Sequence, residues 1–474
     1  MTRPRGQTAF IAPIVAGLAL AGCIDLAPSD RRPAPPIPAL LPTGGAYPPV
    51  SDRPISAWRD FFAETRLVAV INQALANNRD LRVAVANAAA ARGVYGVQRA
   101  NLFPKLNATA SAVYGQTPGA VASPGTAGAG AYNERLYDLN AGVSAWQLDL
   151  FGKVRDSTRA ALDSYFASRE ARDAAQVTLV SQVATAWLTL GADRSLLAIA
   201  RDTQASADAT VTLVQARFAA GAASGLDIAQ AQTAAQQARY DIARLTAQTA
   251  QDRNALELLV GAPVADALLP ADIEASGAVM ADLPSGLPSS VLLSRPDVLQ
   301  AEDQLKAANA NIGAARAAFF PTIALTGSGG VTSLALSGLL RAASETWTFA
   351  PTITQPIFDF GANRGNLAYA KGQRDAALAT YEKAVQTAFR EVSDALATRG
   401  TIDEQLAAQR ALEGAADTAY TLADARDRRG ADTYLNALIA QRTLYAARQT
   451  VVQTRLARAV NLVTLYSTLG GGLR

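Results

Sequence analysis

This chain of 474 residues contains no histidine, a single cysteine and only two methionines. Because histidine is the commonest general base and transition-metal ligand, its absence argues against hydrolytic and metal-dependent enzymes. One cysteine excludes an internal disulfide framework, and the chain has too few Met, His and Cys side chains for a soft-metal relay. No paired-carboxylate or glycine-rich phosphate motif stands out, so we expect neither an enzyme nor a bound metal or cofactor.

Charged and aromatic side chains are also sparse, at 18% and 6% of the residues. The formal net charge is only +3, and the Lys and Arg residues are scattered, so we do not expect nucleic acid as a partner. The length alone would suggest about three compact domains. The abundant alanine instead favours long helices whose backbones approach one another closely.

The N-terminus has the pattern of an export signal. Two arginines precede an apolar run, Phe10–Leu20, which is too short to span a bilayer and ends at Leu20-Ala21-Gly22-Cys23. This motif resembles the bacterial lipobox, which implies a signal peptide over residues 1–22 and a Cys23 carrying S-diacylglycerol and N-palmitoyl groups. Several acyl chains on one cysteine would anchor a protein firmly in a membrane. The residue after the cysteine is Ile24 rather than an aspartate, which resembles the sorting signal of lipoproteins directed to the outer membrane. The alternative for Cys23 is an incidental free thiol.

The remaining chain is built from two similar halves, an internal duplication. A proline-rich spacer completes residues 23–55, and a proline-interrupted segment, 262–295, separates the first repeat, 56–261, from the second, 296–474. Before the strands, the matched positions are Asp80, Gly96, Arg99, Phe103 and Pro104 with Asp297, Gly313, Arg316, Phe320 and Pro321. Later in each half, Gly221, Leu226, Gln232 and Gly261 match Gly430, Leu435, Gln441 and Gly470.

Each half ends in a predicted pair of long helices, over residues 152–261 and 361–470. The second pair carries heptad spacing at Tyr381, Ala388, Ala395 and Ile402 and breaks near Gly430. Its first arm would be about 100 Å long, which suits a coiled coil, a solenoid or a tube. A single shorter helix precedes the strands of each half; the first runs from about Leu67 to just before Pro104.

Between these helices the pattern changes to period two, which predicts β-hairpins over residues 105–149 and 322–358. The strands are about as long as a bilayer crossing requires, although a sheet covering a soluble core would give the same alternation. One chain supplies about four strands and a membrane barrel needs at least about eight. Because open edges are not tolerated in lipid, such strands require an oligomer, whose number the pattern leaves open between a dimer and a trimer.

The mature chain resembles the TolC-like outer-membrane factor family, and most closely its lipoprotein branch, the NodT-type proteins of resistance-nodulation-division (RND) efflux systems. The resemblance is carried by residues 58–62, 74–81, 103–104, 355–359 and 434–442. It implies a mainly helical, internally duplicated fold with four long helices and four strands per protomer. It further implies a homotrimer with a twelve-strand outer-membrane β-barrel continued by a twelve-helix periplasmic α-barrel. The implied function is a passive exit duct in the outer membrane, with a periplasmic adaptor and an inner-membrane RND transporter as partners.

The resemblance also places a gate and a docking surface at the helix breaks. Adaptor contacts are expected at Gly221, Leu226, Gly430 and Tyr434. Leu435 matches the apolar constriction of the family, and the two acidic ring positions fall on Asn436 and Ile439, neither of which is acidic. Asp227 matches a further acidic position, and Asp427 and Asp432 complete the expected aperture. An apolar and polar iris around Leu435 is therefore our preferred interpretation. The charged run nearby leaves two alternatives: Asp424, Asp427 and Asp432 form interhelical ion pairs with Arg426, Arg428 and Arg429, or the run is simply a solvated hairpin tip.

Two other functions stay open at this point. The same architecture serves as the outer-membrane duct for type I protein secretion, which the neighbouring transporter gene would distinguish. A periplasmic coiled-coil adaptor or scaffold belongs to a different class; it would lack the period-two hairpins and would fractionate with the inner membrane. A carboxylate enzyme is the weakest alternative, because no site motif supports it.

Overall fold

A computed structural model describes residues 25–29, 31–47, 61–117, 132–274 and 288–472. The predicted signal peptide and Cys23 lie outside the described residues. The chain divides into two compact units. We call Met1–Pro33, Ala89–Ala167 and Ala301–Thr380 the strand unit, and Ala34–Ala88, Ser168–Gln300 and Tyr381–Arg474 the hairpin unit. Each unit therefore combines segments from both sequence repeats.

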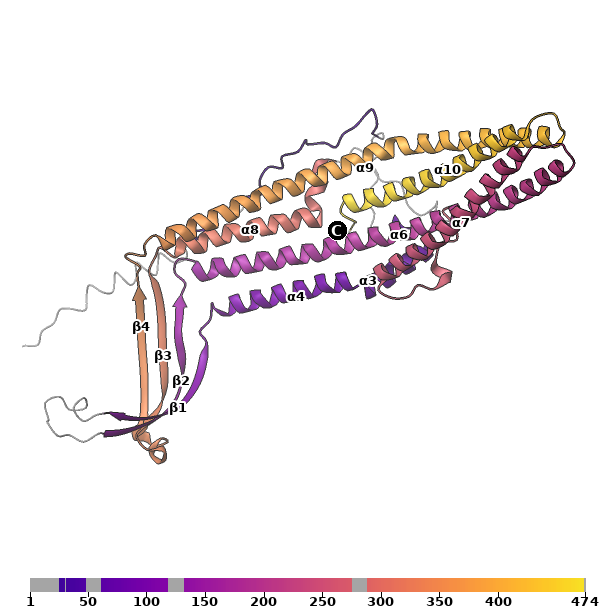
Figure 1. The fold of residues 1–474 in the computed structure, drawn as a ribbon. Coiled ribbons are helices and arrows are strands. Elements are labelled where there is room, and N and C mark those ends of the chain that lie inside the picture. Colours follow the sequence, from indigo (N-terminus) through magenta and orange to yellow (C-terminus); the bar gives the residue numbers. More distant parts are fainter. Residues whose placement is uncertain (1–24, 30, 48–60, 118–131, 275–287, 473–474) are drawn as a thin grey trace, which may run out of the picture. The chain divides into compact units, whose positions relative to one another are not determined.

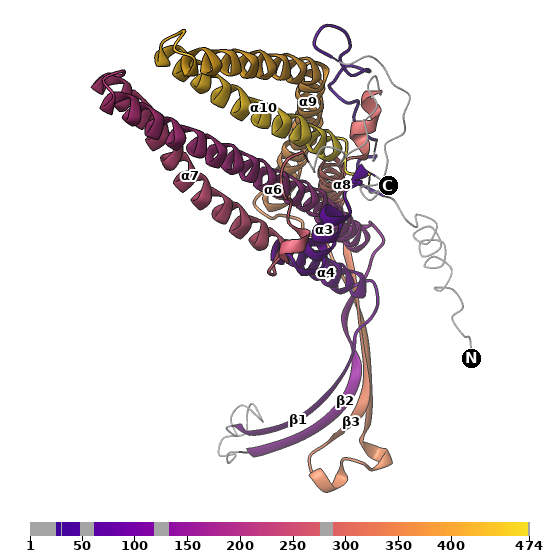
Figure 2. The same ribbon diagram turned by 90° about the vertical axis from the view of Figure 1, so that its right-hand side faces the viewer.

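The strand unit contains one antiparallel sheet with the strand order β1-β2-β3-β4 (Figure 1). The strands are β1, Leu106–Thr117; β2, Tyr132–Leu148; β3, Thr322–Ser333; and β4, Glu345–Thr354. The predicted alternation is present. Ala108 of β1 lies opposite Ala141, and its neighbour Thr109 lies opposite Asn140, so one face is apolar and the other polar. The strands bend along their length (Figure 2), and a bulge interrupts the register between Val143 and Trp146.

Seven α-helices complete the described part of the chain. They are α3, Thr65–Asn77; α4, Arg79–Ala100; α6, Lys153–Ala219; α7, Gly225–Val260; α8, Pro296–Ala317; α9, Ala362–Arg428; and α10, Tyr434–Thr468. The four long helices and four strands expected for the fold are confirmed. Short 3-10 segments lie at Asp266–Leu268, Ser289–Ser294, Leu336–Gly338 and Ala342–Ser344. None of the helices in the described ranges is long and apolar enough to cross a membrane.

The prediction of one helix from Leu67 to just before Pro104 is wrong, because Asn78 separates α3 from α4. Asn78 has an extended ψ of 135°, and its side-chain carbonyl accepts a hydrogen bond from the backbone N–H of Leu81. The same amide donates to the carbonyl of Leu259 in α7. Asn78 therefore caps the start of α4 and ties that start to the first long hairpin.

The apolar core of the hairpin unit lies at the base of the hairpins. The rings of Phe61 and Tyr466 stack with centroids 5.0 Å apart, and Trp187 is fully buried with its indole N–H donating to the carbonyl of Leu268 at 2.9 Å. Valine and leucine side chains of α3, α6, α7 and α10 surround them. The heptad positions of α9 are also buried: Tyr381, Val385, Ala388, Val392, Ala395 and Ile402.

The proline-rich segment behind the predicted lipidation site contacts both units. In the strand unit, Asp25 pairs with Arg159 at 3.1 Å, and Arg316 donates to the carbonyl of Leu26 at 2.7 Å. In the hairpin unit, the carbonyl of Ala39 accepts from the backbone N–H of Ser289 at 2.9 Å. Within its described residues, the segment expected to be a spacer is therefore held by specific contacts at both ends of the stretch from Asp25 to Ala39.

Candidate functional site at the tips of the helical hairpins

The two helical hairpins end in the same backbone motif. After α6, the N–H of Gly221 bonds the carbonyl of Phe218, and that of the next residue bonds the carbonyl of Arg217. After α9, the N–H of Gly430 bonds the carbonyl of Asp427, and that of the next residue bonds the carbonyl of Arg426. These Schellman motifs need a left-handed residue, and the φ angles are +76° at Gly221 and +69° at Gly430. The glycines predicted as adaptor contacts thus have a defined role in making the turns.

One ion pair joins the two hairpins near these turns. Arg217, in the last turn of α6, donates to both carboxylate oxygens of Asp427 in α9, at 2.8 and 3.0 Å. Its second terminal nitrogen donates to the main-chain carbonyl of Asp427 at 3.2 Å. The Asp427 side chain is 7% exposed and that of Arg217 is 26% exposed. The pair is therefore a largely buried, charge-assisted contact between the helical hairpins of the two repeats.

Further polar contacts join the hairpins below the ion pair. Ser206 of α6 lies 3.2 Å from the hydroxyl of Tyr420 in α9 and accepts from the side chain of Gln441 in α10 at 3.1 Å. Tyr445 of α10 donates to the carboxylate of Asp241 in α7 at 2.9 Å, and burial raises the pKa of this tyrosine. Side chains of all four long helices thus meet through polar groups in this region.

Tyr434, the first residue of α10, is half-buried and close enough to Asp427 to feel its charge. Its hydroxyl is buried and has no hydrogen-bond partner within the described residues. Burial, followed by the charge of Asp427, raises the pKa of Tyr434 to about 12. The hydroxyl of Tyr434 is therefore turned inward, and its expected contact with the adaptor stays a prediction.

Two of the predicted aperture acids occupy helix-capping positions. Asp227 forms a capping box at the start of α7, where its carboxylate accepts from the backbone N–H and hydroxyl of Ser224 at 2.8 and 2.7 Å. These bonds lower the pKa of Asp227. Asp432 precedes α10 and accepts from the backbone N–H of Thr433 and the amide of Asn436, which lower its pKa in the same way. Both carboxylates are therefore charged and locally held.

The expected ion pairs of the second tip are only partly correct. Arg428 pairs with Asp424 within α9, and Arg426 reaches Asp432 at 3.3 Å across the turn. Asp427 instead pairs with Arg217, which the sequence had shown only as part of the repeated helix break. Arg426 and Arg428 are engaged with other carboxylates, and an arginine of the other hairpin pairs with Asp427.

The apolar residues predicted at the tips point away from the chain's own helices. Leu226 at the start of α7 and its counterpart Leu435 at the start of α10 are both exposed. Ile439 and Asn436 are exposed on the same helix as Leu435, and Ile439 lies one turn after it. This arrangement leaves an exposed apolar pair, Leu435 and Ile439, on the second tip and a single exposed leucine, Leu226, on the first.

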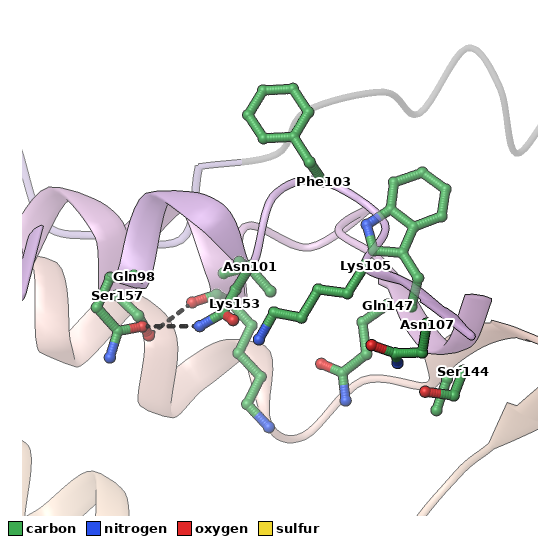
Figure 3. A pocket seen from close by; sticks show the side chains of 12 residues that line it. Gln98, Asn101, Phe103, Lys105, Asn107, Ser144, Gln147, Lys153 and Ser157 are labelled. Carbon is green, nitrogen blue, oxygen red and sulfur yellow. Dashed lines mark hydrogen bonds between the residues drawn. The ribbon is translucent and has the colours of Figure 1, made fainter. Parts of the chain in front are cut away.

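A second candidate lies in the strand unit, where α4 meets β1 and β2 meets α6. A pocket of about 300 Å³ is lined by polar side chains, among them Lys105 and Lys153, whose chains extend from its rim in Figure 3. Asn101 donates to Gln98 at 3.3 Å, and Ser157 donates to the carbonyl of Lys153. No group of His, Cys, Asp or Glu that could hold a metal occurs in the described ranges. We take the hairpin tips as the functional site because a largely buried ion pair joins the two repeats there.

Duplicated pairs of long helices joined to a four-stranded sheet define the TolC-like class of outer-membrane channels. A sequence model of the outer membrane efflux protein family matches residues 70–262 and 287–471. The chain is 42% identical over 463 residues to the toluene efflux pump outer membrane protein TtgC of Pseudomonas putida, covering 97% of this chain and 94% of that protein. It is 38% identical over 462 residues to the outer membrane protein OprJ of Pseudomonas aeruginosa, covering 98% and 95%.

The solved structures agree with these sequence matches. The open state of the MtrE outer membrane channel of Neisseria gonorrhoeae superposes with a TM-score of 0.84 at 36% identity, over 95% of this chain and 99% of that one. The chain belongs to the outer membrane efflux protein family. It is the outer-membrane exit duct of an efflux pump, as the sequence predicted.

Proposed function

We propose that three copies of this chain form a lipid-anchored duct for small apolar compounds, which opens and closes at the hairpin tips. The observation that carries the proposal is the four-stranded sheet, in which β1 and β4 have no further strand partner among the described residues. Unpaired strand edges are not stable in lipid. Three copies would supply twelve strands and leave a lumen, whereas the eight strands of two copies would be filled by side chains.

The proposed closed state depends on the contacts between the two hairpins. Arg217 and Asp427 hold the end of α6 against the end of α9, and the bonds of Ser206 and Tyr445 continue this attachment. A partner that binds a splayed tip more tightly than a closed one would shift the population toward the open state. In this proposal the acidic side chains cap and join helices, and the constriction itself is formed by Leu435, Asn436 and Ile439.

The proposed partners are a periplasmic adaptor and an inner-membrane RND-type transporter. The exposed apolar residues Leu226, Leu435 and Ile439 at the tips favour a helical partner that covers them. Leu226 and Leu435 are repeat counterparts, so three copies would present six similar sites. The substrate class follows relatives whose names specify toluene, solvents and antibiotics. We propose small, predominantly apolar compounds on this basis.

The proposed anchor is an acylated Cys23, carrying the S-diacylglycerol and N-palmitoyl groups that the lipobox implies. The adjoining segment supports it, since Asp25 and Leu26 are held by Arg159 and Arg316 of the strand unit. The acyl chains would then enter the membrane close to the strands. In this proposal the anchor lies in the outer membrane.

The proposal is tested by extracting the full-length protein from outer membranes in mild detergent and measuring the native mass and the N-terminal peptide. A trimer with a triply acylated Cys23 is the expected result, and C23A should lose the acyl mass but remain trimeric. Export is tested in cells lacking this gene, which should accumulate a fluorescent apolar dye until the gene is restored. A water-soluble monomer without acylation, or a deletion strain that loses only a secreted protein, would overturn the proposal.

A further inference from the structure

The polar pocket where α4 meets β1 and β2 meets α6 has no part in the proposed gating. Its volume is about 300 Å³, and all of its lining residues belong to the strand unit. Lys105, just before β1, and Lys153, the first residue of α6, both line it (Figure 3). The whole chain has only five lysines, so two of them at one small pocket concentrate positive charge there.

No carboxylate in the described part of the chain pairs with either of these two lysines. The lining of the pocket contains neither Asp nor Glu. Asp149, just before α6, instead accepts from the backbone N–H of Arg155 at 2.8 Å and pairs with its guanidinium at 3.3 Å. Asp156, in the first turn of α6, is buried and does not line the pocket. Two ammonium groups without a counter-charge therefore lie at this site.

The remaining walls combine free hydrogen-bonding groups with an apolar surface. The side chains of Asn107, Ser144 and Gln147 line the pocket and have no hydrogen-bond partner among the described residues. The indole N–H of Trp146 donates to the carbonyl of Leu102 at 3.3 Å, so this residue offers the pocket its ring rather than a donor. Such walls suit an anion with an apolar body, because the polar groups bind its oxygens and the ring packs on the rest.

A β-bulge shapes one wall of the pocket. The register of β2 shifts between Val143 and Trp146, and Ala145 within this bulge has a left-handed φ of +50°. The backbone N–H of Ala145 donates to the hydroxyl of Thr326 in β3 at 3.1 Å, which holds the bulge in place. A regular strand presents only alternate residues to one side, whereas residues 144–147 all line this pocket.

The second repeat has the same connections but not the same charges. Its Phe-Pro and Phe-Gly pairs align Lys105 with Thr322 and Lys153 with Ala362. Three amide residues of the lining are also replaced by alanine: Gln98, Asn101 and Asn107 match Ala315, Ala318 and Ala324. The fold therefore makes these connections without lysines or amides, so the first repeat does not need them for its own packing.

We propose that this pocket binds small organic anions, with a carboxylate or phosphate group between Lys105 and Lys153 and the apolar remainder against Trp146. A volume of about 300 Å³ suits a compound with a single ring. Asn107 follows the apolar Leu106 in β1, so the pocket adjoins the polar face of the sheet. In the proposed duct that face lines the lumen, because lipid contacts the apolar face.

The inference rests on the proposed function in one respect: solutes reach the pocket as they pass through the duct. It extends the substrate class from apolar compounds to small organic acids. The binding site itself needs only the strand unit of one chain, so binding and export are tested separately.

Binding is measured on full-length protein in a nonionic detergent, from the fluorine NMR relaxation of para-fluorobenzoate. Because both lysines are exposed, we expect a dissociation constant in the millimolar range and a loss of about fivefold in affinity for each of K105M and K153M. The neutral para-fluorobenzyl alcohol should not bind. K371M/K383M is the matched control, since it removes the same charge from two exposed lysines of α9 and should bind para-fluorobenzoate like wild type.

Two results would overturn the anion site: equal binding of para-fluorobenzoate by wild type and K105M/K153M, or equal binding of the neutral alcohol. Inorganic phosphate that displaces the probe at equal concentration would show that the apolar wall contributes nothing, and would overturn an organic ligand. K105R/K153R keeps both charges and should retain binding. K105Q/K153Q, which should not, replaces the methionine variant if that protein does not assemble.

Export is tested in cells that lack this gene. The K105M/K153M gene should restore export of an apolar dye but not resistance to para-fluorobenzoate, whereas wild type and K371M/K383M restore both. Full resistance from K105M/K153M would overturn the role of the pocket in transport. Failure of every version of the gene to export the dye would overturn the proposed duct and leave the measured binding site intact.

Discussion

Replacing Arg217 with alanine should open the hairpin tips. The substitution removes two bonds to the carboxylate of Asp427 and one to its main-chain carbonyl. The carboxylate remains in a site where its side chain is only 7% exposed, so it loses its partner without gaining full hydration. Separating the hairpins would hydrate it. The mutation therefore raises the free energy of the closed tip more than that of the open tip.

The size of the effect follows from the burial of both partners. Breaking a fully buried ion pair destabilises by about 3–5 kcal/mol, but Arg217 is itself 26% exposed, so water reaches part of the site. We therefore expect about 2 kcal/mol per chain, or about a 30-fold change in the ratio of open to closed tips. A tip that is open for about 1% of the time would then be open for about a quarter of the time.

Single-channel recording in planar bilayers measures this change directly, as a rise in open probability or in mean conductance. R426A is the matched control. Arg426 is the repeat counterpart of Arg217, but its side chain is 63% exposed and it makes a 3.3 Å pair with Asp432, a carboxylate less buried than Asp427. R217L/D427L should open less than R217A, since it leaves no buried charge. Wild-type conductance from R217A, or equal effects of R217A and R426A, would refute the gating role of this pair.

Three further predictions concern stability. Burial raises the pKa of Asp193 to about 7, and a hydrogen bond to the carboxylate of Asp252 on α7 is the second cause. The folded chain thus binds a proton more tightly, and its thermal midpoint should fall as the pH rises from about 4 to about 7, less steeply in D193N. G221A and G430A should each weaken their turns by about 1–2 kcal/mol in hydrogen exchange, through left-handed strain. G330A, which drives a Cβ into the main chain of β2, should reduce the folded sheet in membranes, whereas G329A should not.

Each of these predictions has a clear contrary result. Identical pH dependence in wild type and D193N would mean that Asp193 is not the titrating group. Unchanged exchange at both tips in G221A and G430A would show that the turns tolerate a side chain, since open space surrounds each glycine. Equal membrane yields of G330A and G329A would contradict the close approach of β2 and β3.

Periodicity and duplication were sufficient to predict the long helices and the strands. The heptad positions of α9 were readable because one side of that helix is buried over many turns, from Tyr381 to Ile402. The break at Asn78 was missed, since helical spacing continues across it. A local signal existed: an asparagine followed by Arg79 and Asp80 is a suitable N-cap before an acidic first turn.

The partner of Asp427 could not be predicted from local sequence. Arg217 lies 210 positions away, and three arginines lie much closer along the chain. The choice depends on which faces of α6 and α9 meet, which is a property of the assembled hairpins. The role of Asp227 could be predicted from local sequence, because Ser224 and Asp227 have the spacing of a capping box. The resemblance to a channel family instead predicted that Asp227 lines the aperture.

The distribution of apolar burial explains why movement would be confined to the tips. The base of the hairpins buries large side chains such as Trp187, Tyr466 and Leu256, and a core of this kind contributes on the order of tens of kcal/mol. Toward the tips the apolar clusters are small; one consists of Leu197, Ala200 and Leu245. Polar contacts worth about 1–3 kcal/mol each therefore decide the position of the tips. A bound partner could supply that much energy without disturbing the base, so the same helices combine a stable anchor with a movable end.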